Sequence, residues 1–151
     1  MFSVNPPGGR HVAMMIADLL GSTRAAFFEH EWGGLRPSHV RVLSAVPEGG
    51  CTVTALAAQV GMTKQGCGQF VTTMVATGHL AESRAGADRR LRLVTRTPDA
   101  DAVLVRSAAL MASLEDEWRA AVGPRRYATF RSVLEELSAA GTGSAAGSPP
   151  G

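Results

Sequence analysis

The sequence predicts a mainly α-helical fold that carries a small antiparallel β-hairpin. Apolar residues recur at helical spacing over most of the chain, and the pattern changes to strand-like alternation only after Gly78. The chain has 151 residues, of which 45% are hydrophobic. This length and composition are enough for one domain with a buried core, and they exclude wholesale disorder.

Two short helices separated by a turn are expected at the centre of the chain. The first runs from about Thr54 to Val60 and is closed by Gly61, because glycine readily adopts the left-handed conformation that ends helices. Thr63 is expected to cap the second helix. From there the apolar residues fall on one side of the helix, and the other side offers hydrogen-bond donors and acceptors near its N-terminus, as a helix that reads DNA bases does. This polar side comprises Lys64, Gln65, Gly68, Gln69 and Thr72.

A β-hairpin is expected next, with Leu80, Leu91 and Leu93 alternating with polar residues and residues 85–87 as its turn. Exposed arginines are ordinary on a solvated strand, but this hairpin has five arginines and only two acidic residues. From residue 34 to 97 eight Lys or Arg and three Asp or Glu give a net charge of +5, while the remainder carries −3. A basic middle between acidic flanks indicates that the middle meets a polyanion. The hairpin charges are Arg84, Arg89, Arg90, Arg92, Arg96, Glu82 and Asp88.

Three segments carry a resemblance to a known family: L-R-P-S-H-V-R-V-L, T-A-L-A-A-Q-V-G-M-T-K-Q-G and D-R-R-L-R-L-V-T. In this order and spacing, residues 35–98 resemble the winged helix-turn-helix of the MarR family of bacterial transcription regulators, and the likeness extends more loosely to about Leu137. In that family the wing Asp pairs with the Arg two positions on, which implies a pair between Asp88 and Arg90. Gly66 and Gly68 depart from the family pattern, since each costs a helix interior about 1 kcal/mol relative to alanine.

The resemblance implies a homodimeric, sequence-specific DNA-binding transcription regulator, expected to act as a repressor, that binds a pseudo-palindromic double-stranded operator. We expect Gln65 and Gln69 to read bases, helped by Thr63, Lys64 and Thr72 on the same helix. We expect Arg90 to enter the minor groove, positioned by Asp88. Phosphate contacts are expected from Arg84, Arg89 and Arg92. The alternative is a winged-helix module that binds proteins and has lost DNA binding.

Helices are expected at residues 11–29 before this winged helix, at residues 37–46 within it, and from Pro98 to Val122 and from Pro124 onward after it. The resemblance makes residues 10–34 and 98–140 the dimerisation region and 35–97 the DNA-binding region. Residues 1–9 and 141–151 are expected to be flexible ends. An apolar seam on the long helix also indicates pairing, although such stripes are more often internal core. The seam consists of Leu104, Ser107, Met111, Leu114, Trp118 and Ala121.

A small aromatic or lipophilic effector is a further implication of the resemblance. Aromatic and adaptable side chains cluster where the first helix meets the second, and polar groups beside them would orient a ligand. The alternative is that the aromatic residues are simply core. The candidate lining residues are Met15, Phe27, Phe28, His30 and Trp32, with Arg36 or His39 as the polar contact.

Catalysis, metal binding and cofactor binding have no support in the sequence. The four histidines have no cysteine or acidic partner at metal-ligand spacing, and no Ser-His-Asp arrangement is visible. Cys51 and Cys67 do not make a disulfide framework, and Cys67 on the apolar helix face disfavours redox sensing. The apolar run at residues 12–20 contains Asp18 and is too short to span a bilayer. We therefore expect a cytoplasmic protein with no membrane partner.

Overall fold

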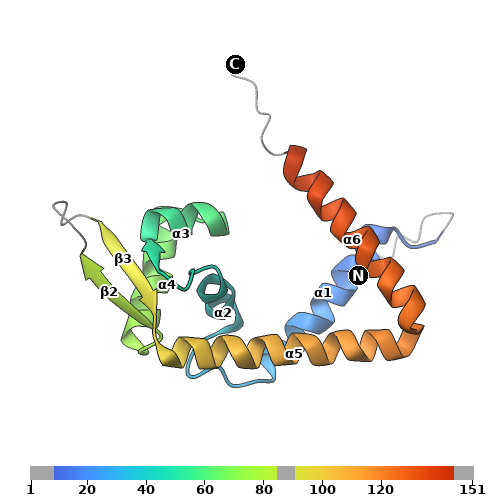
Figure 1. Cartoon of the computed structure of the whole chain (residues 1–151), viewed down its shortest axis with the longest axis horizontal. Helices are drawn as coiled ribbons and strands as arrows, with labels where there is room; N and C mark the ends of the chain where they lie inside the picture. Colours follow the sequence, from blue (N-terminus) through green and yellow to red (C-terminus); the bar gives the residue numbers. More distant parts are fainter. Residues whose placement is uncertain (1–8, 85–90, 145–151) are drawn as a thin grey trace, which may run out of the picture. The chain divides into compact units, whose positions relative to one another are not determined.

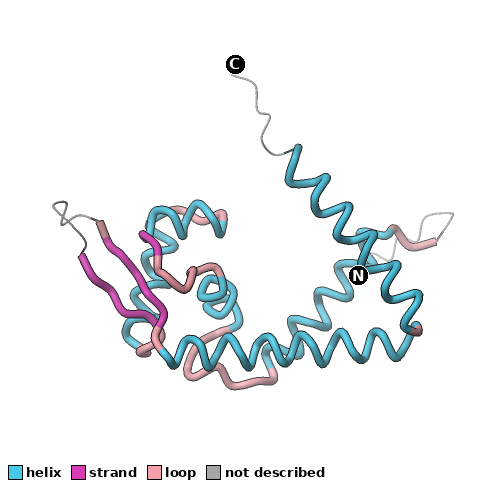
Figure 2. Tube along the Cα trace, viewed as in Figure 1, coloured by secondary structure: helices cyan, strands magenta, loops and turns pink. Residues whose placement is uncertain are grey.

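The computed structural model describes residues 9–84 and 91–144 and is mainly helical, with a small antiparallel sheet (Figures 1 and 2). The predicted fold class is therefore confirmed. The chain divides into two compact units, residues 1–110 and 111–151, and α5 contributes to both. The helices are α1 (Val12–Phe28), α2 (Pro37–Ser44), α3 (Val53–Val60), α4 (Lys64–Ala76), α5 (Pro98–Val122) and α6 (Pro124–Ser144). The strands are β1 (Cys51–Thr52), β2 (Leu80–Arg84) and β3 (Arg92–Arg96).

The helix-turn-helix forms at α3 and α4, where the sequence predicts it. The Thr52 side chain accepts a hydrogen bond from the Ala55 N–H at 3.1 Å and caps α3. Gly61 ends α3 in the left-handed region with φ +68°. The Thr63 hydroxyl accepts the Gly66 N–H at 3.1 Å and starts α4. Side-chain capping and one glycine therefore set the turn between the two helices.

The sheet has the order β1-β3-β2, so β3 is its central strand. Cys51 of β1 lies opposite Val94, and Leu80 of β2 lies opposite Arg96. The fully buried residue of β3 is Val94, whereas Leu91 keeps 46% of its surface exposed. Leu91 precedes β3, and the paired register of the strand turns Val94 inward. The predicted turn at residues 85–87 lies outside the described residues.

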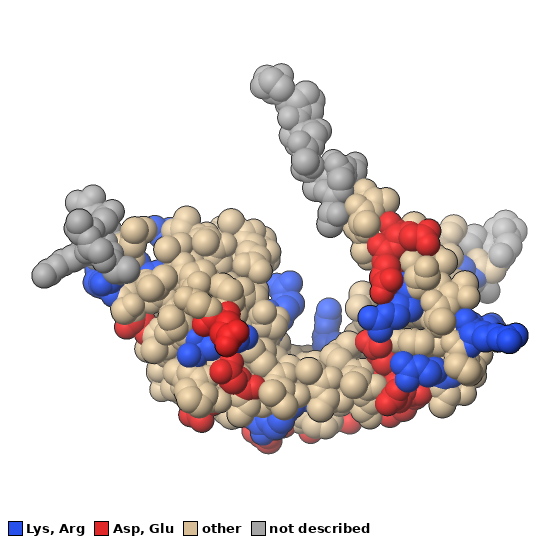
Figure 3. Space-filling model, viewed as in Figure 1, with Lys and Arg blue, Asp and Glu red and all other residues tan. Residues whose placement is uncertain are grey.

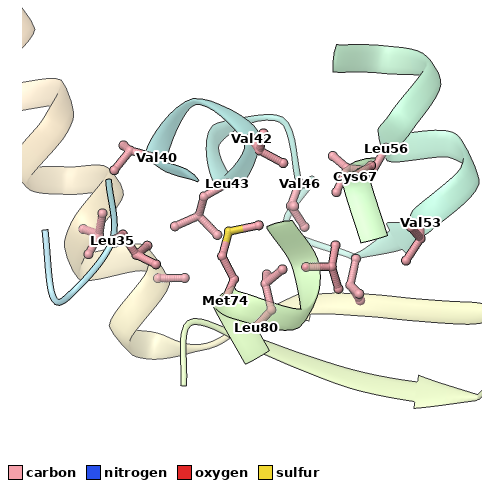
Figure 4. Close-up of a cluster of buried hydrophobic side chains, with 14 of the residues drawn as sticks. Leu35, Val40, Val42, Leu43, Val46, Val53, Leu56, Cys67, Met74 and Leu80 are labelled. Carbon is pink, nitrogen blue, oxygen red and sulfur yellow. The ribbon is translucent and has the colours of Figure 1, made fainter. Parts of the chain in front are cut away.

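The core of the first unit lies between α2, α3, α4 and the sheet. Figure 4 shows side chains from these elements pointing toward one another. Leu43, Leu56 and Met74 are its largest fully buried side chains, at 0% exposure each. The start of α5 joins the same cluster through Ala100 and Val103. The sheet and α4 are thus fixed to one shared core.

Gly50 holds the entry to the sheet in a conformation that other residues rarely adopt. Its φ is +81°, and a Cβ at this position would lie 2.7 Å from the Val94 carbonyl oxygen. The backbone before β1 can therefore approach β3 closely only because residue 50 has no side chain.

The second unit contains the end of α5 and all of α6, joined at Gly123 with φ +86°. The Tyr127 hydroxyl donates to Glu115 Oε2 at 2.7 Å, and Arg131 Nη1 lies 3.3 Å from the same oxygen. The Arg119 guanidinium lies 5.0 Å from the centre of the Tyr127 ring. These contacts tie α6 to α5. Helix α6 continues to Ser144, so the expected flexible tail does not begin at Gly141; a helix end tolerates the roughly 1 kcal/mol cost of a glycine.

Large apolar side chains remain exposed on α1 and α6 of a single chain. Helix α1, which the structure describes in full, has no fully buried residue. The seam of α5 is also incompletely covered, since its residues are half-buried apart from exposed Ala121. No helix in the described ranges is both long and apolar enough to cross a membrane. The large apolar residues exposed on α1 and α6 are Val12, Met14, Met15, Leu19, Leu20, Phe28, Phe130, Val133 and Leu137.

Candidate nucleic-acid interface

An open groove of about 630 Å³ runs along the exposed side of α4, where this helix faces the wing. The groove brings together the polar side of α4 that the sequence predicts and one arginine of the wing. Apart from one glycine, the residues that line the groove are of polar or basic types. Its lining residues are Lys64, Gln65, Gly68, Gln69, Thr72 and Arg92.

The N-terminal end of α4 lies at one end of this groove and has a positive electrostatic potential. Unpaired backbone N–H groups and the helix dipole favour negative charge at a helix N-terminus. The first turn of α4 has no acidic residue, and it begins with Lys64. Thr63 lies just before the helix and uses its hydroxyl as the cap acceptor. In the structure Thr63 caps α4, and its contact with DNA stays a prediction.

The side-chain amides of Gln65 and Gln69 are available to a ligand. Within the described residues neither amide has a hydrogen-bond partner, so both keep their donors and acceptors. Thr72 is different, because its hydroxyl donates to the Gly68 carbonyl at 2.9 Å. That bond leaves the Thr72 oxygen as an acceptor in the groove. The spacing of four residues between Gln65 and Gln69 places both on one side of α4.

Arg92 is held by an acidic partner that sequence reasoning did not assign. Its Nε and Nη2 donate to the two carboxylate oxygens of Glu82 at 2.7 and 2.8 Å. The hydrogen bond from Arg92 lowers the pKa of Glu82, and the same bond raises the pKa of Arg92. Both groups are therefore charged at neutral pH. Only the strand register, which the sequence does not give directly, identifies this pair.

The two unusual glycines of α4 have different surroundings. A Cβ at Gly66 would lie 3.0 Å from the Thr63 hydroxyl oxygen, closer than nearly all real contacts, so glycine leaves room for the capping group. A Cβ at Gly68 would lie 3.5 Å from Arg92 Nη1. That distance is an ordinary van der Waals contact, so the guanidinium lies directly beside the helix at residue 68.

The wing has further basic residues beyond Arg92. Arg84 lies opposite Arg92 in the β2–β3 register and is exposed. Figure 3 shows Lys and Arg side chains near the outer ends of β2 and β3. The predicted contacts of Asp88, Arg89 and Arg90 fall outside the described residues and stay predictions.

The candidate effector residues are partly engaged in packing. Trp32 is only 2% exposed, stacks on Phe27 with 5.1 Å between ring centres, and donates its indole N–H to the Phe27 carbonyl at 2.8 Å. The His30 ring lies 6.0 Å from Trp32. Phe28 and Met15 are 66% and 44% exposed. This packing favours the core interpretation for Trp32 and leaves the exposed pair free to meet another surface.

His39 and Arg36, the candidate polar contacts, lie together at the start of α2. The Arg36 backbone N–H donates to His39 Nδ1 at 3.3 Å, and the His39 ring packs on Phe70 with 4.8 Å between ring centres. Burial, and then the charge of Arg36, lowers the pKa of His39. His39 is therefore neutral at neutral pH. Both residues remain predictions as ligand contacts.

The described residues hold no group of three or more His, Cys, Asp or Glu that could bind a metal ion. Cys67 is fully buried and Cys51 half-buried. Burial raises the pKa of both thiols, and for Cys67 the proximity of Cys51 adds to the effect. A raised pKa leaves little thiolate at neutral pH, which works against a reactive cysteine at either position.

Comparison with known proteins agrees with this geometry. The family model described as MarR family matches residues 33–91, which include α2, α3, α4 and β2. The chain is 38% identical over 112 residues to the HTH-type transcriptional regulator PetP of Rhodobacter capsulatus. This match covers 72% of the chain, which spans 64% of the length of PetP.

Solved structures share the fold at lower sequence identity. The reduced form of MarR from E. coli superposes with a TM-score of 0.75 at 16% identity, covering 87% of this chain and 98% of that one. BpsR of Bordetella bronchiseptica superposes with a TM-score of 0.68 at 21% identity, covering 85% and 99%. Residues 33–91 thus match the MarR family of winged helix-turn-helix transcription regulators, and the chain shares the fold of solved MarR structures.

Proposed function

We propose that this protein is a dimeric repressor that binds a pseudo-palindromic DNA operator in the cytoplasm. The observation that carries the proposal is the groove along α4, whose polar and basic lining contains the amides of Gln65 and Gln69. Two amides on one side of a helix suit recognition of adenine, because a glutamine amide can accept from N6 and donate to N7 at the same time. Lys64 and the wing arginines would supply contacts to phosphates.

Dimerisation is part of the proposal because of the apolar surface that a single chain leaves open. Phe28 and Leu20 of α1 are 66% and 60% exposed, and Leu137 of α6 is 60% exposed. Exposed apolar surface on a helix marks interaction sites in soluble proteins. A symmetric dimer would present two copies of α4, which accounts for a two-fold symmetric operator.

Binding to the operator should depend strongly on salt. Each protomer offers about three or four basic groups to phosphates, so a dimer neutralises about six to eight of them and log K should fall against log salt with a slope of about −5 to −7. Fluorescence anisotropy with fragments from the genomic neighbourhood, measured over a series of salt concentrations, checks this. A slope of about −2 would contradict the role of the wing. Absence of binding to any fragment would favour the alternative, a winged helix that binds protein.

A small aromatic anion is the effector class that we propose. The DNA binding of BpsR, a structural relative, is regulated by 6-hydroxynicotinic acid. In this chain Met15 and Phe28 are exposed, and Arg36 at the start of α2 could pair with a carboxylate. Regulation requires the ligand to prefer the conformation that binds DNA poorly, and a tenfold loss of DNA affinity corresponds to about 1.4 kcal/mol of differential binding.

Hydroxybenzoate and hydroxynicotinate titrations, followed by Trp fluorescence and by operator anisotropy in parallel, test the effector proposal. Millimolar or tighter binding should weaken operator affinity at least tenfold, and Arg36→Ala should reduce both responses. Ligand binding without any change in operator affinity would refute the regulatory role. If Arg36→Ala leaves both responses unchanged, the carboxylate of the ligand binds to a residue other than Arg36.

A further inference from the structure

We propose that Glu82 is a positioning residue that holds Arg92 against α4 at Gly68, and that Arg92 held in this way reads a guanine edge rather than a phosphate. The wing strand β3 would thus supply part of the sequence-reading surface that otherwise belongs to the recognition helix. This inference rests on the proposed DNA binding, and it changes the role that the sequence alone suggested for Arg92.

The strand register places Glu82 and Arg92 on one face of the hairpin. Glu82 lies opposite Val94, and Arg92 is two residues before Val94 on the same strand. Side chains of a strand alternate between faces, so these three residues share a side of the sheet. Val94 on this side enters the core, and Arg92 on the same side lines the groove beside α4. The pair therefore lies at the junction of wing and recognition helix.

Two hydrogen bonds to Glu82 hold the guanidinium beside α4. Glu82 accepts from Arg92 Nε and Nη2 at 2.7 and 2.8 Å, a bidentate geometry that restrains both position and plane. Arg92 Nη1 lies 3.5 Å from where a Cβ of residue 68 would stand, an ordinary contact distance that places the guanidinium directly beside α4. The side chains of Arg92 and Glu82 keep only 32% and 24% of their surface exposed. The guanidinium is thus preorganised before any ligand arrives.

The held arginine keeps the donors that recognise guanine. A guanidinium has five N–H groups, and Glu82 takes one from Nε and one from Nη2. The second N–H of Nη2 and one N–H of Nη1 point in the same direction and form a second pair of donors. Guanine presents O6 and N7 as paired acceptors in the major groove, and an arginine fork on this edge is the commonest specific contact to DNA. Gln65 and Gln69 line the same groove and would read neighbouring positions.

Charge distinguishes a guanine from a phosphate as the target. Glu82 pairs with Arg92 at a distance of 2.7 Å, so these two residues together carry no net charge; Arg84, opposite Arg92 in the register, adds one positive charge beside them. A neutral pair releases few counterions from DNA, and its carboxylate would repel a nearby phosphate. Base edges carry no net charge and lack this penalty. The pair is therefore better suited to reading a base than to anchoring the backbone.

Selection from a random duplex library tests the assignment with the full-length protein. Wild type should enrich a motif with a guanine at one position of each half-site. Arg92→Ala should lower the preference for that guanine about 10- to 100-fold, the usual range for a bidentate contact, while the salt slope changes by less than about 0.5. Glu82→Ala should lower the same preference, and it should raise affinity for random DNA because Arg92 then carries an uncompensated charge.

Asp101→Ala is the matched control. Asp101 pairs with Arg96 of β3 at 3.1 Å, and neither residue lines the groove. Like Glu82→Ala, this variant removes one negative charge and the carboxylate partner of a β3 arginine. It should nevertheless leave every base preference unchanged. Thermal melting of each variant verifies that the fold is intact.

Each outcome decides between defined alternatives. A salt slope weakened by about 2 per dimer in Arg92→Ala, with base preference intact, would make Arg92 a phosphate contact and overturn the inference. Full guanine preference in Glu82→Ala would overturn the positioning role of Glu82. Either result leaves DNA binding by α4 in place. Failure of the wild type to enrich any sequence would instead overturn the proposed function, and the inference with it.

Discussion

Leu56→Ala should destabilise the winged helix by about 2–5 kcal/mol, the range for truncation of a buried leucine. Leu56 of α3 is 0% exposed and belongs to the core that joins α2, α4 and the sheet. The loss combines the transfer energy of the removed atoms with the cost of the cavity they leave. Domains are usually stable by only about 5–15 kcal/mol, so this variant should lose a large part of its stability. Loss of operator binding should follow, because α4 packs on the same core.

Urea unfolding followed by circular dichroism measures this effect at one fixed protein concentration, since dimer stability depends on concentration. Leu91→Ala is the matched control, because it removes the same atoms from a leucine that is 46% exposed. Its effect should stay within about 1 kcal/mol. Equal destabilisation by both variants would contradict the packing described for α3.

The double variant Val133→Asp with Leu137→Asp should convert the dimer into monomers and lower operator affinity by at least about 1,000-fold, because a monomer retains one copy of α4 and loses one half-site with its phosphate contacts. These residues and Phe130 are 47%, 60% and 38% exposed, and their spacing places them along one stripe of α6. Burying two carboxylates in an apolar interface is strongly unfavourable.

Sedimentation velocity at micromolar protein, together with anisotropy on the selected operator, measures both consequences. The matched control is Ala128→Asp with Ser132→Asp, which adds the same two charges at the same spacing on exposed positions of a different side of α6. This control should remain dimeric and bind DNA. A dimeric Val133→Asp, Leu137→Asp protein with full operator affinity would move the interface away from α6.

Local chemistry explains why much of the fold follows from the sequence. Helix starts at α3 and α4 depend on Thr52 and Thr63, whose caps form with residues three positions later. The end of α3 depends on the left-handed conformation of Gly61. The polar side of α4 depends on helical spacing alone, so the sequence by itself places Gln65 and Gln69 on one side of the helix. Each feature involves residues within about one helical turn of one another.

Contacts between distant segments were decided only by the tertiary structure. The sequence indicated basic residues on the wing, but it did not indicate that Glu82 holds Arg92 beside Gly68 of α4. The same holds for the burial of Val94, because pairing with β1 and β2 sets the register of β3. A strand shifted by one residue exchanges its two faces, and nothing within a five-residue strand reports which register the rest of the core will select.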